Sequence, residues 1–114
     1  MNKTQSGNLG EDLAVKFLKT QKYKILERNY KVLHKEVDVI AMDGDTLVFV
    51  EVKTRFATFE ESGASAVDQR KQQNVIFVAK CYMTKNHVKN TQVRFDVVEI
   101  NQGQLNHIKN AFEL

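Results

Sequence analysis

The fold of this chain is decided by residues 46–54, whose sequence is TLVFVEVKT. The stretch is rich in β-branched and aromatic residues and contains neither Gly nor Pro, which predicts a β-strand. Because side chains alternate across a strand, one face carries Leu47, Phe49, Glu51 and Lys53, and the other carries Val48, Val50 and Val52. Both faces begin apolar. We therefore expect a central strand covered on both sides, with charged residues on one face at its C-terminal end.

A second strand is predicted just before this one, over residues 36–42 (EVDVIAM). Asp43-Gly44-Asp45 separates the two runs, and Gly tolerates the positive φ that a tight hairpin turn needs. In an antiparallel pair folded about Gly44, Asp38 and Glu51 become near neighbours on one surface. The sequence therefore predicts two adjacent carboxylates on neighbouring strands.

Two carboxylates so placed predict a divalent-metal site. A few ångströms apart they repel each other by about 4 kcal/mol at an effective dielectric near 20, and a buried sheet end is poorly solvated. Mg²⁺ (or Mn²⁺) removes that conflict, because it binds one or two carboxylates together with waters and a phosphate. Lys53 would orient or deprotonate the attacking water and offset phosphate charge. The simpler alternative is an ordinary solvated ion pair, since acid-x-Lys sequences also arise by chance.

Further motifs accompany these residues in a fixed order. They are GEDLA at 10–14, RNY at 28–30, EVDVIA at 36–41, LVFVEVKTR at 47–55, Val67 with Lys71, and RFDVV at 94–98. With this series the chain resembles the YraN-type family of small bacterial proteins, which belongs to the PD-(D/E)xK nuclease superfamily and is similar to archaeal Holliday-junction resolvases. The resemblance covers nearly the whole chain. One departure is Lys35, where members of the family usually have Gly.

The resemblance implies an α/β protein with a restriction-endonuclease-like three-layer fold, in which helices flank a central mixed β-sheet. It also implies a metal site formed by Asp38 and Glu51, with Glu11 supporting the metal from the first helix. Lys53 is the implied catalytic lysine. The implied catalytic set is therefore Asp38, Glu51, Lys53 and Glu11.

Glu11 has a second interpretation as a helix-capping residue. Asn8 is a suitable N-cap, and a carboxylate three residues later reaches back to the cap amide and favours the helix dipole. The helix would run to about residue 21. It would pack on the sheet through an apolar stripe of Leu9, Leu13, Ala14, Phe17 and Leu18. Both roles are compatible with one side chain.

Charge and motif together indicate DNA as the partner. The net charge is +3 and the pI about 9.0, which is borderline for a nucleic-acid-binding domain. Arg55 and Lys71 are the better candidates for phosphate contacts, because the family pattern includes them. Gln69 is a further candidate in the polar first half of the second helix, where an exposed helix end is the simpler interpretation. Such contacts would make affinity fall with salt.

The remaining elements follow from periodicity and turn signals. We expect a strand over residues 23–32, a helix from Ala66 to about Met83 with Ser65 and Asp68 as a capping pair, a strand over 91–100 and a short terminal helix over 105–114. The order of these elements predicts a mixed sheet flanked by helices. The 114 residues suffice for one domain covering 1–114.

The composition predicts a cytoplasmic protein without a membrane segment. No stretch approaches the ~18–20 apolar residues of a membrane helix, and the polar N-terminus lacks the apolar segment of a secretion signal. Cys81 is the single cysteine and is expected to be a core thiol in a reducing compartment. His34, His87 and His107 are far apart in sequence, so no zinc site is predicted and all three are expected at the surface.

These features predict a Mg²⁺- or Mn²⁺-dependent endonuclease that hydrolyses DNA, with branched or structured DNA favoured by analogy. Two alternatives use the same fold: a non-catalytic nucleic-acid-binding module, and a partner protein in DNA uptake or repair. A homodimer would suit symmetric cutting of two strands, although no sequence feature requires one.

Overall fold

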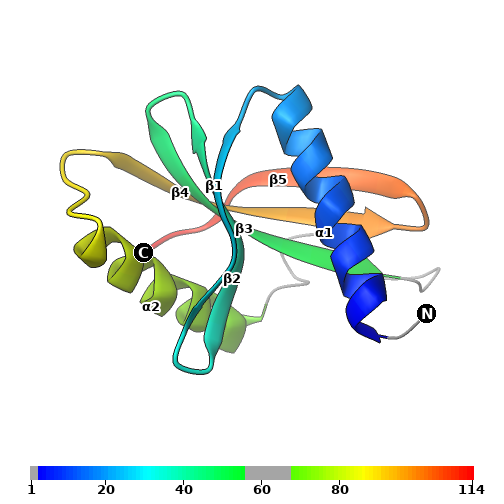
Figure 1. Cartoon of the computed structure of the whole chain (residues 1–114), viewed down its shortest axis with the longest axis horizontal. Helices are drawn as coiled ribbons and strands as arrows, with labels where there is room; N and C mark the ends of the chain where they lie inside the picture. The colour runs from blue at the N-terminus through cyan, green and yellow to red at the C-terminus, as the bar shows by residue number, and fades with distance from the viewer. Residues whose placement is uncertain (1–2, 56–67) are drawn as a thin grey trace.

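The structure is a computed structural model that describes residues 3–55 and 68–114, with side chains described for residues 9–54 and 68–114. Two helices and five strands lie within those residues (Figure 1). In chain order they are α1 (Lys3–Thr20), β1 (Lys24–Val32), β2 (Lys35–Asp43), β3 (Thr46–Arg55), α2 (Gln69–Lys85), β4 (Gln92–Asn101) and β5 (Gln104–Phe112). The first six elements have the expected types, and a strand replaces the expected terminal helix.

The described strands form a mixed sheet in the order β1-β2-β3-β4-β5. Neighbouring strands are antiparallel except β3 and β4, which are parallel. Parallel neighbours need a crossover connection, and α2 lies in the segment that joins them. β2 and β3 form the predicted hairpin, with Gly44 at φ +60° in the turn. The expectation of an α/β fold with a mixed sheet flanked by helices is confirmed.

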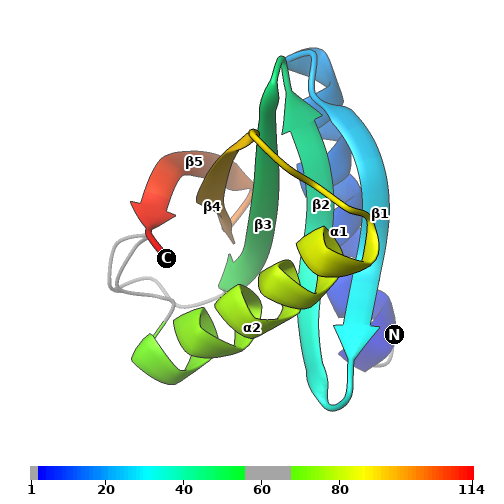
Figure 2. The same ribbon diagram turned by 90° about the vertical axis from the view of Figure 1, so that its left-hand side faces the viewer.

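Each helix covers one face of the sheet (Figure 2). On one face α1 contributes Ala14 to a buried cluster that includes Val48 and Val50 of β3. On the other face α2 contributes Val78 to a cluster that includes Phe49. Fully burying side chains of this size stabilises the fold by roughly 1.5–3 kcal/mol each. The alternation predicted for β3 is therefore confirmed, and both of its faces are covered.

The expected terminal helix over residues 105–114 is wrong, because residues 104–112 form β5. Residues four apart share one face in a strand as well as in a helix, so Ile108 and Phe112 fit both structures. The β4–β5 register shifts between the Phe95 and Val97 pairings, and Asn110 of β5 has φ +55° there. That irregularity interrupts the strict alternation by which a strand is recognised in sequence.

The beginning and the buried side of α1 also differ from expectation. The helix already starts several residues before Asn8, so Asn8 is not its N-cap and Glu11 cannot complete a capping pair. Ala14 is fully buried, whereas Leu9 and Leu13 are 49% and 53% exposed. The apolar stripe predicted for α1 is therefore wrong at Leu9 and Leu13, which face solvent.

The second helix begins later than expected, at Gln69. Asp68 is its N-cap, and the carboxylate Oδ1 accepts the backbone N–H of Lys71 at 2.8 Å. Ser65 and Ala66, the expected capping partner and first residue, lie outside the described residues. Within the described part of the chain, no helix is long and apolar enough to cross a membrane.

Candidate metal centre at the fork between β2 and β3

The first carboxylate of the candidate site lies where β2 and β3 separate. Their pairing ends at Val39↔Val50, and beyond it the strands diverge (Figure 2). Where the strands diverge, their backbones no longer hydrogen-bond to each other, and each buried N–H group needs another acceptor. The Asp38 carboxylate supplies one, since its Oδ2 accepts the backbone N–H of Val52 at 2.8 Å. Asp38 is thereby held between the two strands, largely buried.

Glu51 of β3 is the second carboxylate at this fork and is 3% exposed. Its Oε2 lies 3.2 Å from Nζ of Lys71, in the first turn of α2. Its Oε1 is buried and has no hydrogen-bond partner. A buried carboxylate oxygen without a donor costs free energy. Oε1 is therefore a position at which a proton or a cation would be stabilising.

Burial and neighbouring acidic charges raise the pKa of both carboxyl groups. Burial is the largest cause for Asp38, and with the Glu11 charge it outweighs the Val52 hydrogen bond and raises the pKa to about 6. For Glu51, burial and the Asp38 charge raise the pKa to about 8, with Lys71 acting in the opposite direction. The Asp38 charge is thus close enough to oppose the ionisation of Glu51, as expected of carboxylates sharing one site.

Glu11 approaches the fork from α1, on the opposite side of the sheet from α2. The approach is close because residue 10 is Gly: a Cβ there would clash with Oγ1 of Thr54 on β3. Burial raises the pKa of Glu11, and its charge in turn raises that of Asp38. Its Oε1 lies 3.8 Å from Nη2 of Arg28. The site therefore receives acidic residues from α1, β2 and β3.

The two lysines predicted near the site take different positions. Lys53 is exposed, two residues beyond Glu51 on β3, and is paired in register with Glu99 of β4. Lys71 contacts the acidic pair directly. Partial burial lowers the pKa of Lys71, but the Glu51 and Asp38 charges outweigh burial and leave that pKa raised, so its ammonium stays charged. Lys71 is thus a counter-ion of Glu51, in addition to its predicted phosphate contact.

Gln69 and Arg55 complete the set of predicted nucleic-acid contacts. Gln69 is exposed at the first position of α2, two residues from Lys71. Arg55 is the last residue of β3, four residues beyond Glu51, and its side chain lies outside the described residues. Both positions follow Glu51 along the chain, and their contacts with DNA stay a prediction.

Known relatives of this chain carry one family name. A sequence profile of the uncharacterised protein family UPF0102 matches residues 10–100. The chain belongs to this family. A UPF0102 protein of Persephonella marina is 41% identical over 108 residues, which is 95% of this chain and 93% of that protein. UPF0102 proteins of Caldicellulosiruptor saccharolyticus and Clostridioides difficile are 43% and 40% identical, each over 98% of this chain and 100% of the relative.

Membership of UPF0102 confirms the predicted resemblance to the YraN-type family, and it leaves membership of the nuclease superfamily a prediction. The matched residues include every predicted site residue, from Glu11 to Lys71. The names of the relatives describe no activity. What a UPF0102 protein does therefore has to be argued from the chemistry of the site.

The acidic pair of this UPF0102 protein fits a hard divalent cation. Mg²⁺ prefers oxygen ligands and usually binds one or two carboxylates while keeping several waters, and carboxylate oxygens also suit Mn²⁺. Asp38 and Glu51 supply two carboxylates, including the buried Oε1 that has no partner. Among the described side chains, no three His, Cys, Asp or Glu gather closely enough to hold a metal. The third-ligand role of Glu11 therefore stays a prediction.

A second buried charged cluster, around Asp96 of β4, was missed by sequence reasoning. Asp96 Oδ1 accepts Arg94 Nε at 2.9 Å and the backbone N–H of Asn110 at 3.0 Å, while Oδ2 lies 2.8 Å from His107 Nε2. Burial acts to raise the pKa of Asp96, but these hydrogen bonds outweigh burial and lower it. The expectation of an exposed His107 is wrong, because its side chain is 8% exposed. The cluster links β5 to β4 and gives the RFDVV motif a structural role. The one sign of the cluster in the sequence is that Arg94 and Asp96 share a strand face.

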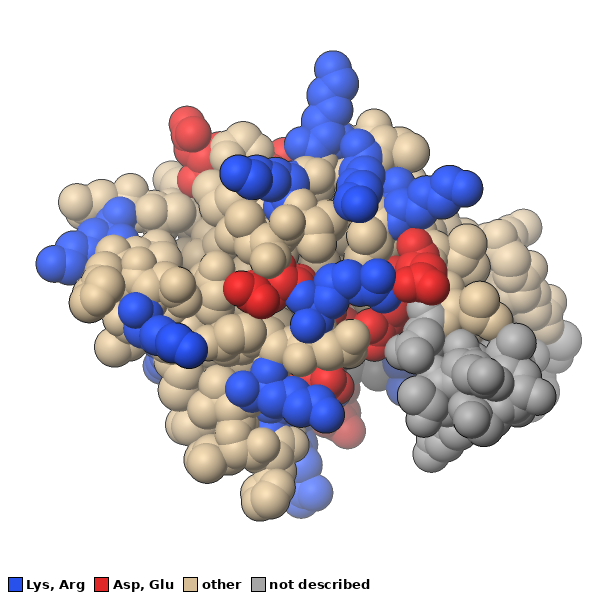
Figure 3. All heavy atoms as spheres, viewed as in Figure 1, with Lys and Arg blue, Asp and Glu red and all other residues tan. Residues whose placement is uncertain are grey.

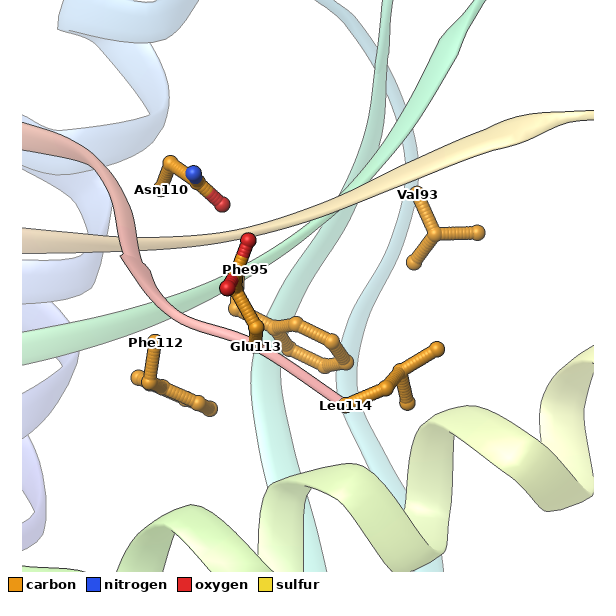
Figure 4. A pocket seen from close by; sticks show the side chains of 6 residues that line it. All are labelled: Val93, Phe95, Asn110, Phe112, Glu113 and Leu114. Atoms are coloured by element: carbon orange, nitrogen blue, oxygen red, sulfur yellow. The ribbon is translucent and has the colours of Figure 1, made fainter.

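A cavity of about 320 Å³ opens elsewhere, between the start of β4 and the end of β5 (Figure 4). It is lined by Val93, Phe95, Asn110, Phe112, Glu113 and Leu114. None of the predicted site residues lines it. The cavity is thus separate from the acidic pair, and the candidate chemistry of this UPF0102 protein lies at the fork.

Proposed function

We propose that this UPF0102 protein is a Mg²⁺- or Mn²⁺-dependent endonuclease that hydrolyses DNA phosphodiester bonds on a restriction-endonuclease-like fold. One observation carries the proposal: Asp38 and Glu51 are buried together at the β2–β3 fork, and a buried Glu51 oxygen has no partner. Burying two mutually repelling carboxylates destabilises a fold unless they serve a function or are neutralised. A bound divalent metal ion would neutralise the two carboxylates and give them a function.

Each residue of the site has a role in this proposal. Asp38 and Glu51 hold the ion, with Glu11 supporting it from α1. The bound ion would make a coordinated water more acidic and stabilise charge on the phosphate oxygens. Lys53 is exposed beside the pair, where it orients or deprotonates the attacking water and offsets phosphate charge. Lys71 balances the charge of Glu51.

DNA is the proposed partner, and three features support it. The chain is basic overall, with net charge +3. Lys53 and Gln69 are exposed, two residues after Glu51 and two residues before Lys71 in the chain. Branched or structured DNA is the preferred substrate because of the resemblance to Holliday-junction resolvases. A homodimer is the proposed assembly for cutting two strands symmetrically, and the cytoplasm is the proposed location.

Cleavage assays with matched variants test the proposal. Single-stranded, duplex, flap and four-way-junction DNA are incubated with Mg²⁺, with Mn²⁺ and with chelator. The wild type should cut in either metal, whereas Asp38→Asn, Glu51→Gln and Lys53→Ala should each lose at least about a hundredfold in rate. Asp45→Asn is the control, because it removes one carboxylate from the exposed hairpin turn. Cutting that survives chelation or Lys53→Ala would assign the activity to a contaminant.

A second candidate function is a non-catalytic nucleic-acid-binding module. It is favoured by Lys71, which already places an ammonium 3.2 Å from Glu51, and by the absence of a three-ligand group among the described side chains. Isothermal titration with Mg²⁺ and Mn²⁺ separates the two functions. A nuclease should bind metal in the wild type and lose that binding in Asp38→Ala. A module should bind DNA in chelator and show no Asp38-dependent metal binding.

A further inference from the structure

The outward side of α2 differs in charge from the rest of the molecule. Within Gln69–Lys85 there are four basic residues, Arg70, Lys71, Lys80 and Lys85, and no Asp or Glu. The next acidic residue along the chain is Asp96. Figure 3 shows Lys and Arg side chains lying over α2 at the lower left. This helix therefore offers a positive surface that no acidic residue of its own neutralises.

An aromatic ring lies within this surface. Phe77 is 36% exposed, and Nζ of Lys35 from β2 lies 4.4 Å from the centroid of its ring. Phe77, Lys80, Cys81, Thr84 and Lys85 line a shallow, mainly apolar depression of about 480 Å³. Their spacing places them along one stripe of the helix. The stripe combines an accessible aromatic group with ammonium groups on both sides of it.

The stripe lies on the same helix as Lys71, which contacts the candidate metal centre, but about 120° around the helix axis from it. Lys71 precedes Phe77 by six residues, which is about 9 Å along a helix. Lys35 precedes Asp38 by three residues, which is about 10 Å along a strand. Both are separations between backbone positions, and they place the ring within a few nucleotide lengths of the acidic pair. A strand of DNA whose phosphate lies at Asp38 and Glu51 would reach Phe77 within a few nucleotides.

We propose that the α2 stripe (Phe77, Lys80, Cys81, Thr84 and Lys85), together with Lys35 of β2, binds an unpaired strand of DNA beside the Asp38–Glu51 site. The placement of the DNA strand beside the metal site relies on the proposed function. The binding of DNA by the stripe does not. Unpaired bases stack on exposed aromatic rings while lysines contact the phosphates. A regular duplex keeps its bases stacked inside, so it would use the lysines and leave Phe77 without a partner. The chemistry of the stripe thus favours single-stranded segments, such as those at forks and flaps.

Fluorescence anisotropy in chelator tests this binding without any cleavage. The probes are labelled oligo-dT and a duplex of the same length, at one fixed salt concentration. Phe77→Ala should weaken binding of oligo-dT about tenfold, in line with base–aromatic stacking, and change duplex binding less than twofold. Phe77→Tyr should retain wild-type affinity because it keeps a ring. Leu33→Ala is the matched control, since Leu33 is a 78% exposed apolar residue in the β1–β2 turn.

A second variant keeps the test valid if Phe77→Ala fails to fold, which circular dichroism would reveal. Lys80 is exposed, and Lys80→Gln should reduce the slope of log affinity against log salt by about one for oligo-dT. Equal losses for oligo-dT and duplex in Phe77→Ala, or no salt-slope change in Lys80→Gln, would overturn the proposal. So would a wild type that binds neither probe. Binding without metal-dependent cutting would support the stripe and count against the nuclease.

Discussion

Replacing Glu51 by Gln should make the stability of the fold less dependent on pH. The pKa of this buried carboxyl is about 8 in the folded protein, against about 4.3 in an unfolded chain. Between those values the folded protein keeps a proton that the unfolded chain has lost, so stability falls as pH rises. Below about pH 4 both states are protonated and the penalty disappears, and above pH 8 it is constant.

The size of the effect follows from the two pKa values. The penalty is roughly 2 kcal/mol at pH 5.5 and roughly 4 kcal/mol at pH 7.5, at about 1.4 kcal/mol for each tenfold difference in proton affinity. A glutamine amide in place of the carboxyl group would carry no charge at either pH. The free energy of unfolding of Glu51→Gln relative to the wild type should therefore be roughly 2–3 kcal/mol more favourable at pH 7.5 than at pH 5.5.

Urea denaturation followed by circular dichroism measures this difference. Wild type and Glu51→Gln are unfolded in chelator at pH 5.5, 6.5 and 7.5, so that no metal ion contributes. Glu27→Gln serves as the control, because it removes a carboxylate that is exposed on β1. Parallel stability curves for wild type and Glu51→Gln would show that Glu51 ionises normally in the folded protein. Such curves would refute a buried pair of mutually repelling carboxylates.

Three further predictions concern the metal, the α1 contact and the Asp96 cluster. At pH 8, 10 mM Mg²⁺ should raise the melting temperature of the wild type by several degrees and leave that of Glu51→Gln nearly unchanged, as scanning fluorimetry would show. Gly10→Ala should cost about 1–3 kcal/mol in urea denaturation, because its methyl group meets Thr54; an unchanged midpoint would contradict the close approach. Asp96→Asn should cost about 1–3 kcal/mol, because Arg94 loses its buried partner but keeps the Asp43 carboxylate; a loss below about 0.5 kcal/mol would show that the cluster is dispensable.

The central hairpin could be predicted because local rules determine it. Alternating apolar residues on β2 and β3, with Gly44 between them, specify both strands and the register that brings Asp38 towards Glu51. The nature of β5 could not be predicted in this way. Ile108 and Phe112 fit a helix and a strand equally well, and pairing with β4 decides between them.

Contacts between distant elements were the other limit of sequence reasoning. The Lys71–Glu51 ion pair depends on how α2 crosses between two parallel strands, and no local pattern encodes that placement. Asp96 and His107 are eleven residues apart on paired strands, so each looked like an isolated polar residue. The type and spacing of acidic residues at the fork were predictable from sequence, whereas the cations that neutralise them were not.

Lys71 also explains how the acidic pair folds before any divalent ion binds. One ammonium balances one carboxylate, and it does so at Oε2 of Glu51. Asp38 accepts the backbone N–H of Val52, which carries no net charge, and the pKa of both acids stays raised. The folded site thus lacks about one positive charge. A divalent ion held by these residues would more than supply that charge and would displace the protons, so metal affinity should increase as pH rises from 5 to 9.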